Sequence, residues 1–422
     1  MVQERKALTR IAIIGAGAAG CFCAIEIKRR MPSAEVIVLE GGSKPLAKVA
    51  ITGGGRCNLT NSFAGTGNLS QAYPRGAQLM KRVLMRFDQN DTWRWFENAG
   101  VPLTLQDDCC VFPQSQDAME IVRTLEKLMK KSGVSVRCRS KVSTISERAE
   151  GGFTVGFEDS SLPPLDCDKV VVTTGGSPKR GGLSFLSPLD LEIEEPVPSL
   201  FTFNIDDSSL KSLMGAVVEN VTVSIPGTRF KAEGPLLVTD WGLSGPAVLK
   251  LSSYAARHLS GCSYISPLTV SWMCCANESA VAAMLSDMAG ANPKKQVSSV
   301  YPPELSSRIW EHLIKRASLR EDIRWGEMGG KSISRLASAL SSDTYRITGR
   351  CHFKGEFVTC GGVALSNIDI RTLEAKKHPG LCFAGEVLDV DAITGGFNLQ
   401  AAWSMGFVAA STICSDGGAC SC

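Results

Sequence analysis

The chain has 422 residues, and its 45 Lys and Arg residues against 42 Asp and Glu residues leave a formal net charge of +3. That length favours two or three domains with room for a sizeable core. No long run of one charge sign is present that could hold a phosphate backbone, so we expect no nucleic-acid partner. The 16 cysteines are scattered along a long chain, as cytosolic thiols are, and none forms the C-x-x-C spacing of zinc or dithiol sites. We therefore expect a cytoplasmic protein without a metal site.

The start of the chain has two interpretations. Arg5, Lys6 and Arg10 precede an uncharged run, residues 11–25, in the manner of a secretory signal. Glycines within the run would interrupt an apolar helix, and the run is shorter than the roughly 18 residues that a membrane span needs. We therefore expect neither export nor membrane insertion.

A buried strand followed by a glycine turn opens the chain. Residues 10–14 read Arg-Ile-Ala-Ile-Ile, which is typical of a strand buried on both faces. Three glycines follow at the G-x-G-x-x-G spacing. The first permits a tight turn, the second lets the backbone approach a pyrophosphate, and the third lets the next helix pack on the strand. The N-terminus of that helix would face the diphosphate. The residues expected there are Gly15, Gly17, Ala18, Ala19 and Gly20.

The helix is expected over residues 18–30, because basic residues suit its last turn and Pro32 stops it. A second strand is expected over residues 35–39, and it ends at Glu40, where an acid would accept hydrogen bonds from a ribose. A carboxylate there would repel a 2′-phosphate, so NADP is disfavoured at this site. Glycines at this spacing also occur in purely structural β-α-β units, but the complete series of strand, turn, helix, strand and acid favours a dinucleotide.

Residues 52–58 read Thr-Gly-Gly-Gly-Arg-Cys-Asn, a glycine turn followed by a cation and an amide. Consecutive glycines expose backbone N–H groups, and Arg56 could neutralise phosphate or a reduced, anionic flavin. A mobile surface loop is the alternative. Cys57 could be redox-active, although a packed small hydrophobe is the interpretation we prefer.

Two later clusters decide between NAD and FAD. Residues 169–176 form a buried strand that runs into a Thr-Thr-Gly-Gly turn containing Thr174 and Gly175, and an acid-bearing cluster follows far later in the chain. A NAD-binding Rossmann domain does not need that later cluster. In FAD enzymes a late acid commonly binds the ribityl hydroxyls, and Asp389 or Glu386 fits this role. The helix expected after Asn398 would point at the flavin.

At these residues the chain resembles the bacterial FAD-binding oxidoreductases that include the BaiN-type and aminoacetone-oxidase-type proteins. The resemblance spans nearly the whole chain. Its carriers are residues 13–20 (Ile-Ile-Gly-Ala-Gly-Ala-Ala-Gly), 52–61 (Thr-Gly-Gly-Gly-Arg-Cys-Asn-Leu-Thr-Asn), 111–113 (Val-Phe-Pro), 174–177 (Thr-Gly-Gly-Ser), 242–246 (Gly-Leu-Ser-Gly-Pro), 385–391 (Gly-Glu-Val-Leu-Asp-Val-Asp) and 394–400 (Thr-Gly-Gly-Phe-Asn-Leu-Gln).

The resemblance implies an FAD-binding domain made from both ends of the chain, with the adenine meeting the main chain of Val142 and the ribityl and flavin region lined from Gly385 to Asn398. The full set of residues expected at the cofactor is Gly15, Gly17, Ala18, Ala19, Gly20, Glu40, Arg56, Cys57, Asn58, Val142, Thr174, Gly175, Gly385, Glu386, Asp389, Gly395, Gly396, Asn398 and Leu399.

The expected fold class is α/β, a discontinuous Rossmann-type domain with a parallel sheet and an inserted region. Short alternating runs punctuated by Gly and Pro predict a β-rich insert, and apolar spacings of three to four residues then predict a helical subdomain. The expected bounds are 1–192 and 346–422 for the FAD-binding domain, 193–275 for the β-rich substrate domain and 276–345 for the helical subdomain.

One segment departs from the family pattern. Relatives usually carry a glycine-rich stretch ending in Gly-His after Gly181 and Gly182, whereas here residues 183–195 are shortened and lack those glycines and the histidine. If the lost turn touches substrate in relatives, their substrates do not transfer to this chain.

The function expected from these features is an FAD-dependent oxidoreductase that moves a hydride between flavin N5 and a small organic substrate. The chain shows no second G-x-G-x-x-G, so a nicotinamide would dock directly at the flavin. NADH, NADPH or oxygen could be the second partner. Two alternatives stay open: a NAD-dependent dehydrogenase without flavin, and a non-catalytic flavin-binding sensor or RNA-modification partner. The substrate, the direction of electron flow, the catalytic acid or base and the oligomeric state are not specified by the sequence.

Overall fold

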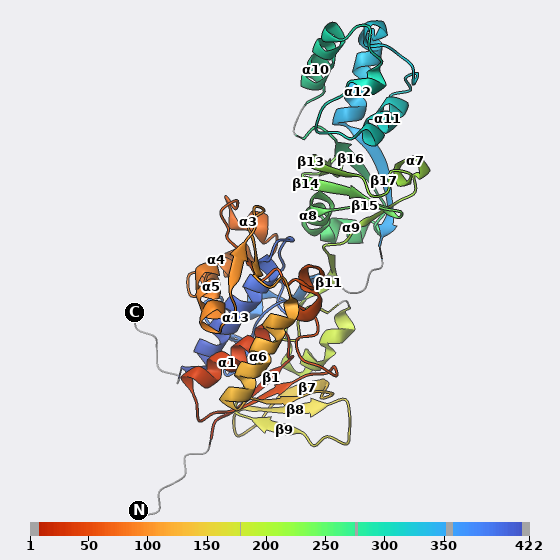
Figure 1. The fold of residues 1–422 in the computed structure, drawn as a ribbon. Helices are drawn as coiled ribbons and strands as arrows, with labels where there is room; N and C mark the ends of the chain where they lie inside the picture. The colour runs from red at the N-terminus through yellow and green to blue at the C-terminus, as the bar shows by residue number, and fades with distance from the viewer. Residues whose placement is uncertain (1–7, 178, 275–276, 352–357, 416–422) are drawn as a thin grey trace, which may run out of the picture. The chain divides into compact units, whose positions relative to one another are not determined.

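The computed structural model describes residues 8–177, 179–274, 277–351 and 358–415. The chain divides into two compact units (Figure 1). The terminal unit comprises Met1–Pro198 and Val358–Cys422, and the inserted unit comprises Ser199–Phe357. The two ends of the chain therefore build one unit, as the resemblance implies.

A five-stranded parallel sheet forms the centre of the terminal unit, with the strand order β19-β10-β1-β2-β6. Its strands are β1 Arg10–Ile14, β2 Glu35–Leu39, β6 Ser135–Arg137, β10 Lys169–Val172 and β19 Leu381–Phe383. The inner strands are apolar along most of their length because both faces of the sheet are covered. The Rossmann-type parallel sheet expected from the sequence is confirmed.

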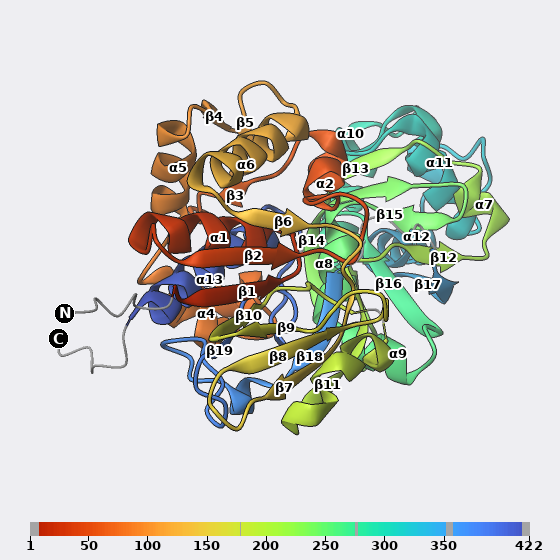
Figure 2. The same cartoon turned by 90° about the horizontal axis from the view of Figure 1, so that it is seen from below.

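Three helices of the terminal unit pack beside one another (Figures 1 and 2): α1 Ala18–Arg30 contacts both α6 Ala118–Ser132 and α13 Phe397–Cys414. The predicted bounds of α1 and β2 are confirmed. Basic residues occupy the last turn of α1, where their charge complements the negative end of the helix dipole. Helix α13 contacts α1 although the whole inserted unit lies between the two helices in the sequence.

Smaller sheets and short helices complete the terminal unit. One antiparallel sheet contains β3 Thr60–Asn61, β5 Cys110–Pro113 and β4 Leu103–Leu105, another contains β7 Val142–Glu147, β8 Phe153–Phe157 and β9 Leu165–Cys167, and β11 Ile193–Ser199 pairs with β18 Val358–Val363. The short helical elements are η1 Val49–Ile51, α2 Thr52–Gly55, α3 Leu69–Ala72, α4 Ala77–Leu84, α5 Gln89–Asn98, η2 Arg180–Leu189 and η5 Leu365–Asn367.

The inserted unit is built on a closed barrel with the strand order β12-β15-β14-β13-β16-β17. All neighbouring strands are antiparallel, and β17 pairs with both β16 and β12 to close it. The strands are β12 Phe203–Ile205, β13 Val217–Ser224, β14 Lys231–Val238, β15 Gly242–Ser244, β16 Ser266–Ser271 and β17 Asp343–Arg350. Closure leaves no open sheet edge in the barrel.

The helical part of the inserted unit lies between two neighbouring barrel strands in the sequence, after β16 and before β17. Its elements and the other helices of the unit are α7 Ser208–Lys211, α8 Pro246–Tyr254, α9 Ala256–Gly261, α10 Glu278–Ala291, η3 Val297–Ser299, α11 Ser307–Arg316, η4 Trp325–Glu327 and α12 Gly330–Ser341. One apolar core runs through the barrel and the helices. Residues 346–350, which we assign to the FAD-binding domain on sequence grounds, pair within the barrel because β17 is its closing strand.

Among the helices of the described residues, none has both the length and the apolar character that crossing a bilayer requires. Arg5 and Lys6, which suggest a signal sequence, lie outside the described residues.

A buried carboxylate joins the helical part of the inserted unit to its barrel. Asp343, at the start of β17, accepts hydrogen bonds from Nε and Nη2 of Arg316 at 2.9 and 2.6 Å and from Nε1 of Trp272 at 3.1 Å. Tyr345 Oη donates to the same carboxylate at 2.5 Å and lies 3.0 Å from Nε2 of His312. Because the Tyr345 proton is directed at Asp343, Nε2 of His312 is the donor in its own bond with Tyr345.

The buried imidazole predicts a pH dependence of stability. Burial lowers the pKa of His312, while the nearby Asp343 charge opposes that shift. A histidine whose pKa is lower in the folded than in the unfolded state takes up a proton on unfolding, so its contribution is fully present above the unfolded pKa of about 6.5 and is lost as the pH falls below it. We expect the free energy of unfolding by urea to fall less for His312→Gln than for the natural chain between about pH 8 and about pH 5.5. If the free energy of unfolding fell equally with pH in both proteins, His312 would not contribute to the pH dependence of stability.

Candidate functional site

The first glycine turn has two glycines that the protein itself requires and one that faces open space. Gly15 has a φ of +105°, and a Cβ there would lie 2.5 Å from the carbonyl oxygen of Thr173. A Cβ at Gly20 would overlap the carbonyl oxygen of Gly15, so the helix can pack this closely only with glycine. At Gly17, by contrast, no heavy atom lies within 4 Å of the position that a Cβ would take. The tight turn at Gly15 and the close helix packing at Gly20 are as the spacing predicts, and the open space lies at Gly17, where the spacing predicts that a pyrophosphate approaches the backbone.

The start of α1 offers backbone donors next to that open space. Gly17 is the N-cap residue and provides no side-chain cap, and the first turn of a helix contains N–H groups without intrahelical acceptors. Ala18 is half-buried and Ala19 buried at this end. The helix dipole adds partial positive charge there, so an anion would be stabilised beside Gly17.

Glu40 ties the end of β2 to the glycine turn. Its Oε2 accepts from the backbone N–H of Ala16 at 2.9 Å and its Oε1 from that of Gly42 at 2.7 Å. The backbone N–H of Ser140 donates to the Glu40 carbonyl oxygen at 2.8 Å, which brings the start of β7 and Val142 close to this acid. Val142 follows Ser140 by two residues, and each Glu40 oxygen has a further lone pair for another donor.

The carboxyl ends of β1, β10 and β19 meet at one edge of the sheet. Thr174 is exposed just beyond β10, and its Cα would lie 2.9 Å from a Cβ at Gly15. Gly175 follows with a φ of +74°. Gly385, just beyond β19, has a φ of +86°, and a Cβ there would lie 3.2 Å from the Cβ of Ala19. Residues from three distant parts of the sequence thus surround the start of α1.

Glu386 is a largely buried acid at this edge. Its Oε1 accepts from the backbone N–H of Thr359 at 2.6 Å, and the backbone of Gly176 also donates to it. Burial raises the pKa of Glu386, and the positive charge of Lys48 opposes that shift. Asp389 is half-buried on the same loop, where its backbone N–H donates to the Val363 carbonyl oxygen at 3.0 Å.

The helix predicted after Asn398 is α13, which begins two residues earlier than predicted, at Phe397. Gly396 is its N-cap residue, with a φ of +88° and no side-chain cap, and a Cβ there would overlap the carbonyl oxygen of Thr60. Gly395 and Leu399 flank this turn and are half-buried. The first turn of α13 therefore presents backbone N–H groups as α1 does, at a second place in the unit.

Two asparagines expected beside a cofactor hold the protein's own backbone with their side chains. The Asn398 amide accepts from the Ala392 backbone N–H at 2.9 Å and donates to the Ala392 carbonyl oxygen at 3.0 Å. The Asn58 amide donates to the Thr60 carbonyl oxygen at 3.0 Å and accepts from the Gly396 backbone N–H at 3.3 Å. Asn58 thus joins the loop of residues 52–58 to the start of α13.

The glycine run before Arg56 is left-handed at Gly53 and Gly54, so α2 is a turn rather than a regular helix. Cys57 is fully buried, and burial raises the pKa of its thiol to about 12, which suits a packed thiol better than a redox-active one. The exposed Arg56 stacks its guanidinium over the ring of Phe112, with Cζ 4.6 Å from the ring centroid.

Two sets of polar residues at the site are missing from the sequence-based prediction. Arg75 forms a bidentate ion pair with Asp391, and the two side chains are only 12% and 0% exposed. Gln400 accepts from Oγ1 of Thr60 at 2.5 Å and donates to Oγ of Ser404 at 2.8 Å, which fastens β3 to α13. Asp391 and Gln400 lie within the motifs already singled out, but Arg75 and Thr60 are more than 300 residues away from them, so the sequence gives no local signal of either pairing.

The segment that departs from the family pattern, residues 183–195, contains most of η2 and the start of β11. Leu183, Phe185 and Leu189 are buried, and η2 packs against β7. Nε2 of His378 lies 2.8 Å from the Leu189 carbonyl oxygen, and its Nδ1 lies 3.0 Å from Oε1 of Glu147 on β7. In this chain the shortened segment is part of the packing of the terminal unit.

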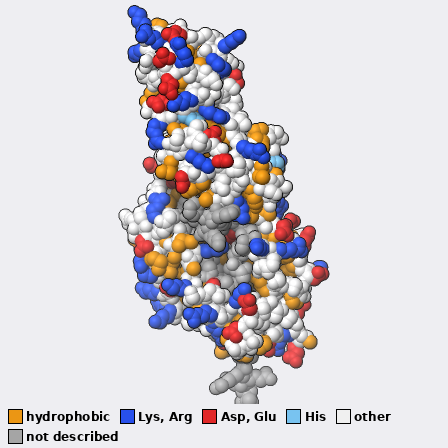
Figure 3. Space-filling view, turned by 90° about the vertical axis from the view of Figure 1, so that its right-hand side faces the viewer, with side chains coloured by type: hydrophobic (Ala, Val, Ile, Leu, Met, Phe, Trp, Pro, Cys, Tyr) orange, Lys and Arg blue, Asp and Glu red, His pale blue; other side chains and the backbone are white. Residues whose placement is uncertain are grey.

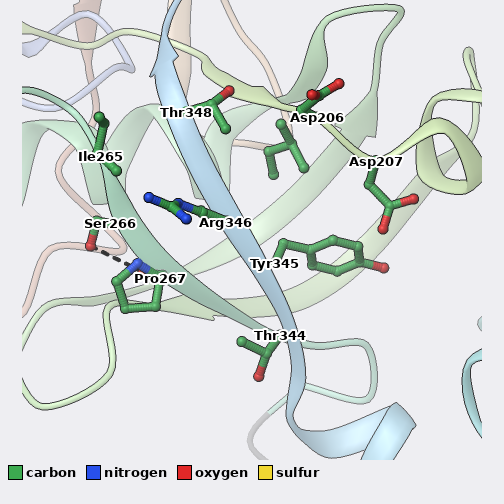
Figure 4. Close-up of a pocket in the computed structure, with 10 residues that line it drawn as sticks. Asp206, Asp207, Ile265, Ser266, Pro267, Thr344, Tyr345, Arg346 and Thr348 are labelled. Atoms are coloured by element: carbon green, nitrogen blue, oxygen red, sulfur yellow. Dashed lines mark hydrogen bonds between the residues drawn. The ribbon is translucent and has the colours of Figure 1, made fainter.

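A groove of about 910 Å³ lies on the inserted unit (Figure 4). Its lining includes the exposed Thr344, Arg346 and Thr348 of β17 together with Asp206 and Asp207. None of the residues predicted for the cofactor lines it. No cluster of His, Cys, Asp or Glu suited to a metal ion occurs within the described ranges.

Comparison with known proteins finds matches along nearly the whole chain. A family model described as the HI0933-like protein Rossmann domain matches residues 9–412. A protein of Escherichia coli (strain K12) named ribosomal RNA dihydrouridine synthase is 30% identical over 413 residues, which cover 94% of this chain and 96% of that protein. A protein of Clostridium scindens named 3-dehydro-bile acid delta(4,6)-reductase is 25% identical over 417 residues, 95% of this chain and 98% of that protein.

Among solved structures, the 3-ketosteroid-delta4-(5alpha)-dehydrogenase from Rhodococcus jostii RHA1 in complex with 4-androstene-3,17-dione is similar with a TM-score of 0.47 and 14% identity, over 98% of this chain and 99% of that one. The family match and the full-length relatives confirm the resemblance found in the sequence motifs. The chain therefore belongs to the family of the HI0933-like protein Rossmann domain.

Proposed function

We propose that this chain is an FAD-dependent oxidoreductase. The observation that carries the proposal is that two uncapped helix N-termini, those of α1 and α13, lie in one unit although they come from opposite ends of the chain. One anion site would serve a diphosphate, and the second suits a flavin ring that gains negative charge on reduction. A NAD-binding β-α-β unit needs only the first.

We propose FAD-binding roles for the residues that surround the two helix N-termini. Gly17 leaves the space that a diphosphate needs, and backbone N–H groups of α1 would bind its oxygens. Glu40 would accept from the adenosine ribose, while Glu386 and Asp389 would bind the ribityl hydroxyls. Bound FAD supplies a two-electron hydride carrier at N5.

The substrate class is proposed from the names of the relatives. Dihydrouridine is uridine with its C5–C6 double bond saturated, and a delta(4,6)-reductase of a 3-dehydro-bile acid acts on double bonds conjugated to a ketone. In both compounds the double bond that is reduced is conjugated to a carbonyl group. The proposed reaction is hydride delivery from the reduced flavin to one carbon of such a bond in a small molecule, with a proton added at the other carbon and NADH or NADPH as the electron donor. Oxygen is the second partner only in the opposite direction, in which it would accept the electrons that the flavin takes from a substrate. The site would have to bind the carbonyl oxygen, where negative charge develops.

Ribosomal RNA is the second candidate substrate, and the 30% identity over 94% of the chain favours it. Basic and acidic side chains are interspersed over the face drawn in Figure 3, which favours the small molecule. The proposal includes a cytoplasmic location for either substrate, in keeping with cysteines that are scattered along a long chain.

The test is an absorption spectrum of the purified protein, followed by anaerobic addition of NADH and then NADPH. We expect flavin bands that bleach with a nicotinamide and return when a Δ4-3-ketosteroid is added. Return with an unmodified ribosomal RNA transcript, but not with the steroid, would select the RNA. Bands that no donor or substrate alters would favour a sensor. A colourless protein that FAD cannot reconstitute would contradict the proposal and favour a NAD-dependent dehydrogenase.

A further inference from the structure

Phe63, on the loop after β3, has a backbone conformation that aromatic residues rarely adopt. Its φ is +60°, in the left-handed region, where the Cβ of a bulky residue is crowded by the backbone. Such a conformation persists only where the surrounding structure imposes it, and it is concentrated at functional sites. Phe63 is not among the residues predicted for the cofactor, so the contacts that impose its conformation have to be identified.

Asn61 holds the Phe63 backbone against the turn that precedes α13. Its Oδ1 accepts from the backbone N–H of Phe63 at 2.8 Å, and its Nδ2 donates to the Gly395 carbonyl oxygen at 2.9 Å. The Asn61 side chain is itself buried. Because one buried amide makes both hydrogen bonds, Phe63 is fixed beside the start of α13, where the proposed function locates the flavin ring.

The ring of Phe63 is covered on only part of its surface. It packs perpendicular to the ring of Phe397, the first residue of α13, with the centroids 5.0 Å apart and the planes at 85°. Phe397 is buried by this contact and others, whereas Phe63 is half-buried. The next two residues, Ala64 and Gly65, are small and exposed, and a Cβ on Gly65 would meet no heavy atom within 4 Å. An apolar surface therefore remains uncovered at the start of α13.

We propose that Phe63 is a specificity-determining residue whose ring contacts the fused rings of the substrate beside the flavin. This inference rests on the proposed function, and it narrows the substrate class to apolar ketones with several fused rings. A phenyl ring offers contact area and no hydrogen-bonding group. It therefore favours a flat apolar molecule in proportion to the area that the two cover.

Packing alone is the alternative role for Phe63, and another aromatic residue shows what that role looks like. Tyr264, in the inserted unit, is also half-buried with a φ of +60°, and its ring is perpendicular to that of Phe201 at 5.4 Å. Tyr264 belongs to the core of that unit and has no link to the start of α13 among the described contacts. It is therefore a matched control, with the same backbone conformation and the same ring geometry.

The test compares the binding of two ketones to the holoenzyme. Both 4-androstene-3,17-dione and 2-cyclohexenone contain the conjugated ketone, but only the first has further fused rings. Their dissociation constants are measured from the change in the flavin spectrum, for the natural chain and for Phe63→Asn, Phe63→Tyr and Tyr264→Asn. Asparagine adopts the left-handed conformation more readily than phenylalanine does, so it removes the ring without adding strain.

We expect the natural chain to bind the steroid more tightly than 2-cyclohexenone. Phe63→Asn should reduce that preference about tenfold, as the loss of about 55 Å² of apolar contact would. Phe63→Tyr, which keeps the ring, and Tyr264→Asn should retain the preference. If Phe63→Asn does not retain FAD, Phe63→Gly takes its place, because glycine adopts a positive φ without strain.

The possible failures are separable. An unchanged preference after loss of the Phe63 ring would overturn the inference, because a purely structural role would affect both ketones alike. An equal loss in Tyr264→Asn would overturn it as well. If a nicotinamide bleaches the flavin of the natural protein but the steroid binds no more tightly than 2-cyclohexenone, the inference is wrong and the proposed oxidoreductase stands. If the natural protein does not bind FAD, the proposed function fails and the inference fails with it.

Discussion

Replacing Gly17 by valine should abolish FAD binding and leave the apoprotein folded. No heavy atom lies within 4 Å of the position of a Cβ at Gly17, so the protein itself has room for the new side chain. The backbone there has a φ of −84°, which a residue with a side chain can adopt. The valine would occupy the space in which we place the diphosphate. We expect the affinity for FAD to fall by about a thousandfold or more, which corresponds to roughly 4 kcal/mol.

The measurement is FAD titration of the apoprotein, with circular dichroism to monitor folding. Gly290→Val is the matched control, because Gly290 also has nothing within 4 Å but lies in α10 of the inserted unit. Gly20→Val should instead fail to fold, since its Cβ would overlap the Gly15 carbonyl oxygen. Tight FAD binding by Gly17→Val would show that the first glycine turn is not the diphosphate site.

Replacing Arg75 by methionine should lower the free energy of unfolding by about 3–5 kcal/mol, because it leaves a buried carboxylate without its cation. Asp391 is fully buried and Arg75 is 12% exposed. The pair also joins two distant segments through an antiparallel bridge between the same two residues. Urea unfolding of the apoprotein measures the effect.

Two further variants test the reason for that loss. Adding Asp391→Leu to Arg75→Met removes the stranded charge and should recover part of the stability. Arg94→Met breaks an exposed pair with Asp91, whose side chains are 68% and 35% exposed, and should cost no more than about 1 kcal/mol. An Arg75→Met protein as stable as Arg94→Met would contradict the importance of the buried pair.

The parts that the sequence predicts well are those with local signals. The signals that set the bounds of α1 and β2 lie within a few residues of those bounds. They are the glycine turn, the basic residues in the last turn of α1, and Pro32. The start of α13 is predicted to within two residues, because the glycine pair Gly395 and Gly396 precedes it. In each case the determinant is the backbone conformation or the charge of the residues themselves, so no distant partner has to be known.

The remaining features depend on partners that are far apart in the chain. β17 closes the barrel by pairing with β12 and β16, and nothing in residues 343–350 identifies those strands. The roles of Asn58 and Asn398 depend on which carbonyl groups the fold brings near them. Periodicity and motif spacing contain no information on such long-range pairing.

The discontinuity of the terminal unit has a consequence for synthesis of the protein on the ribosome. Glu40 emerges early, whereas β19 and α13 are translated only after the complete inserted unit. At about 5–20 residues per second, the delay between Glu40 and the end of α13 is roughly 20–75 s. During that time the barrel can close, but β10 lacks its neighbour β19 and exposes an apolar edge. The proposed FAD site is therefore complete only on a nearly finished chain, so FAD bound there would stabilise the mature fold and not its early stages.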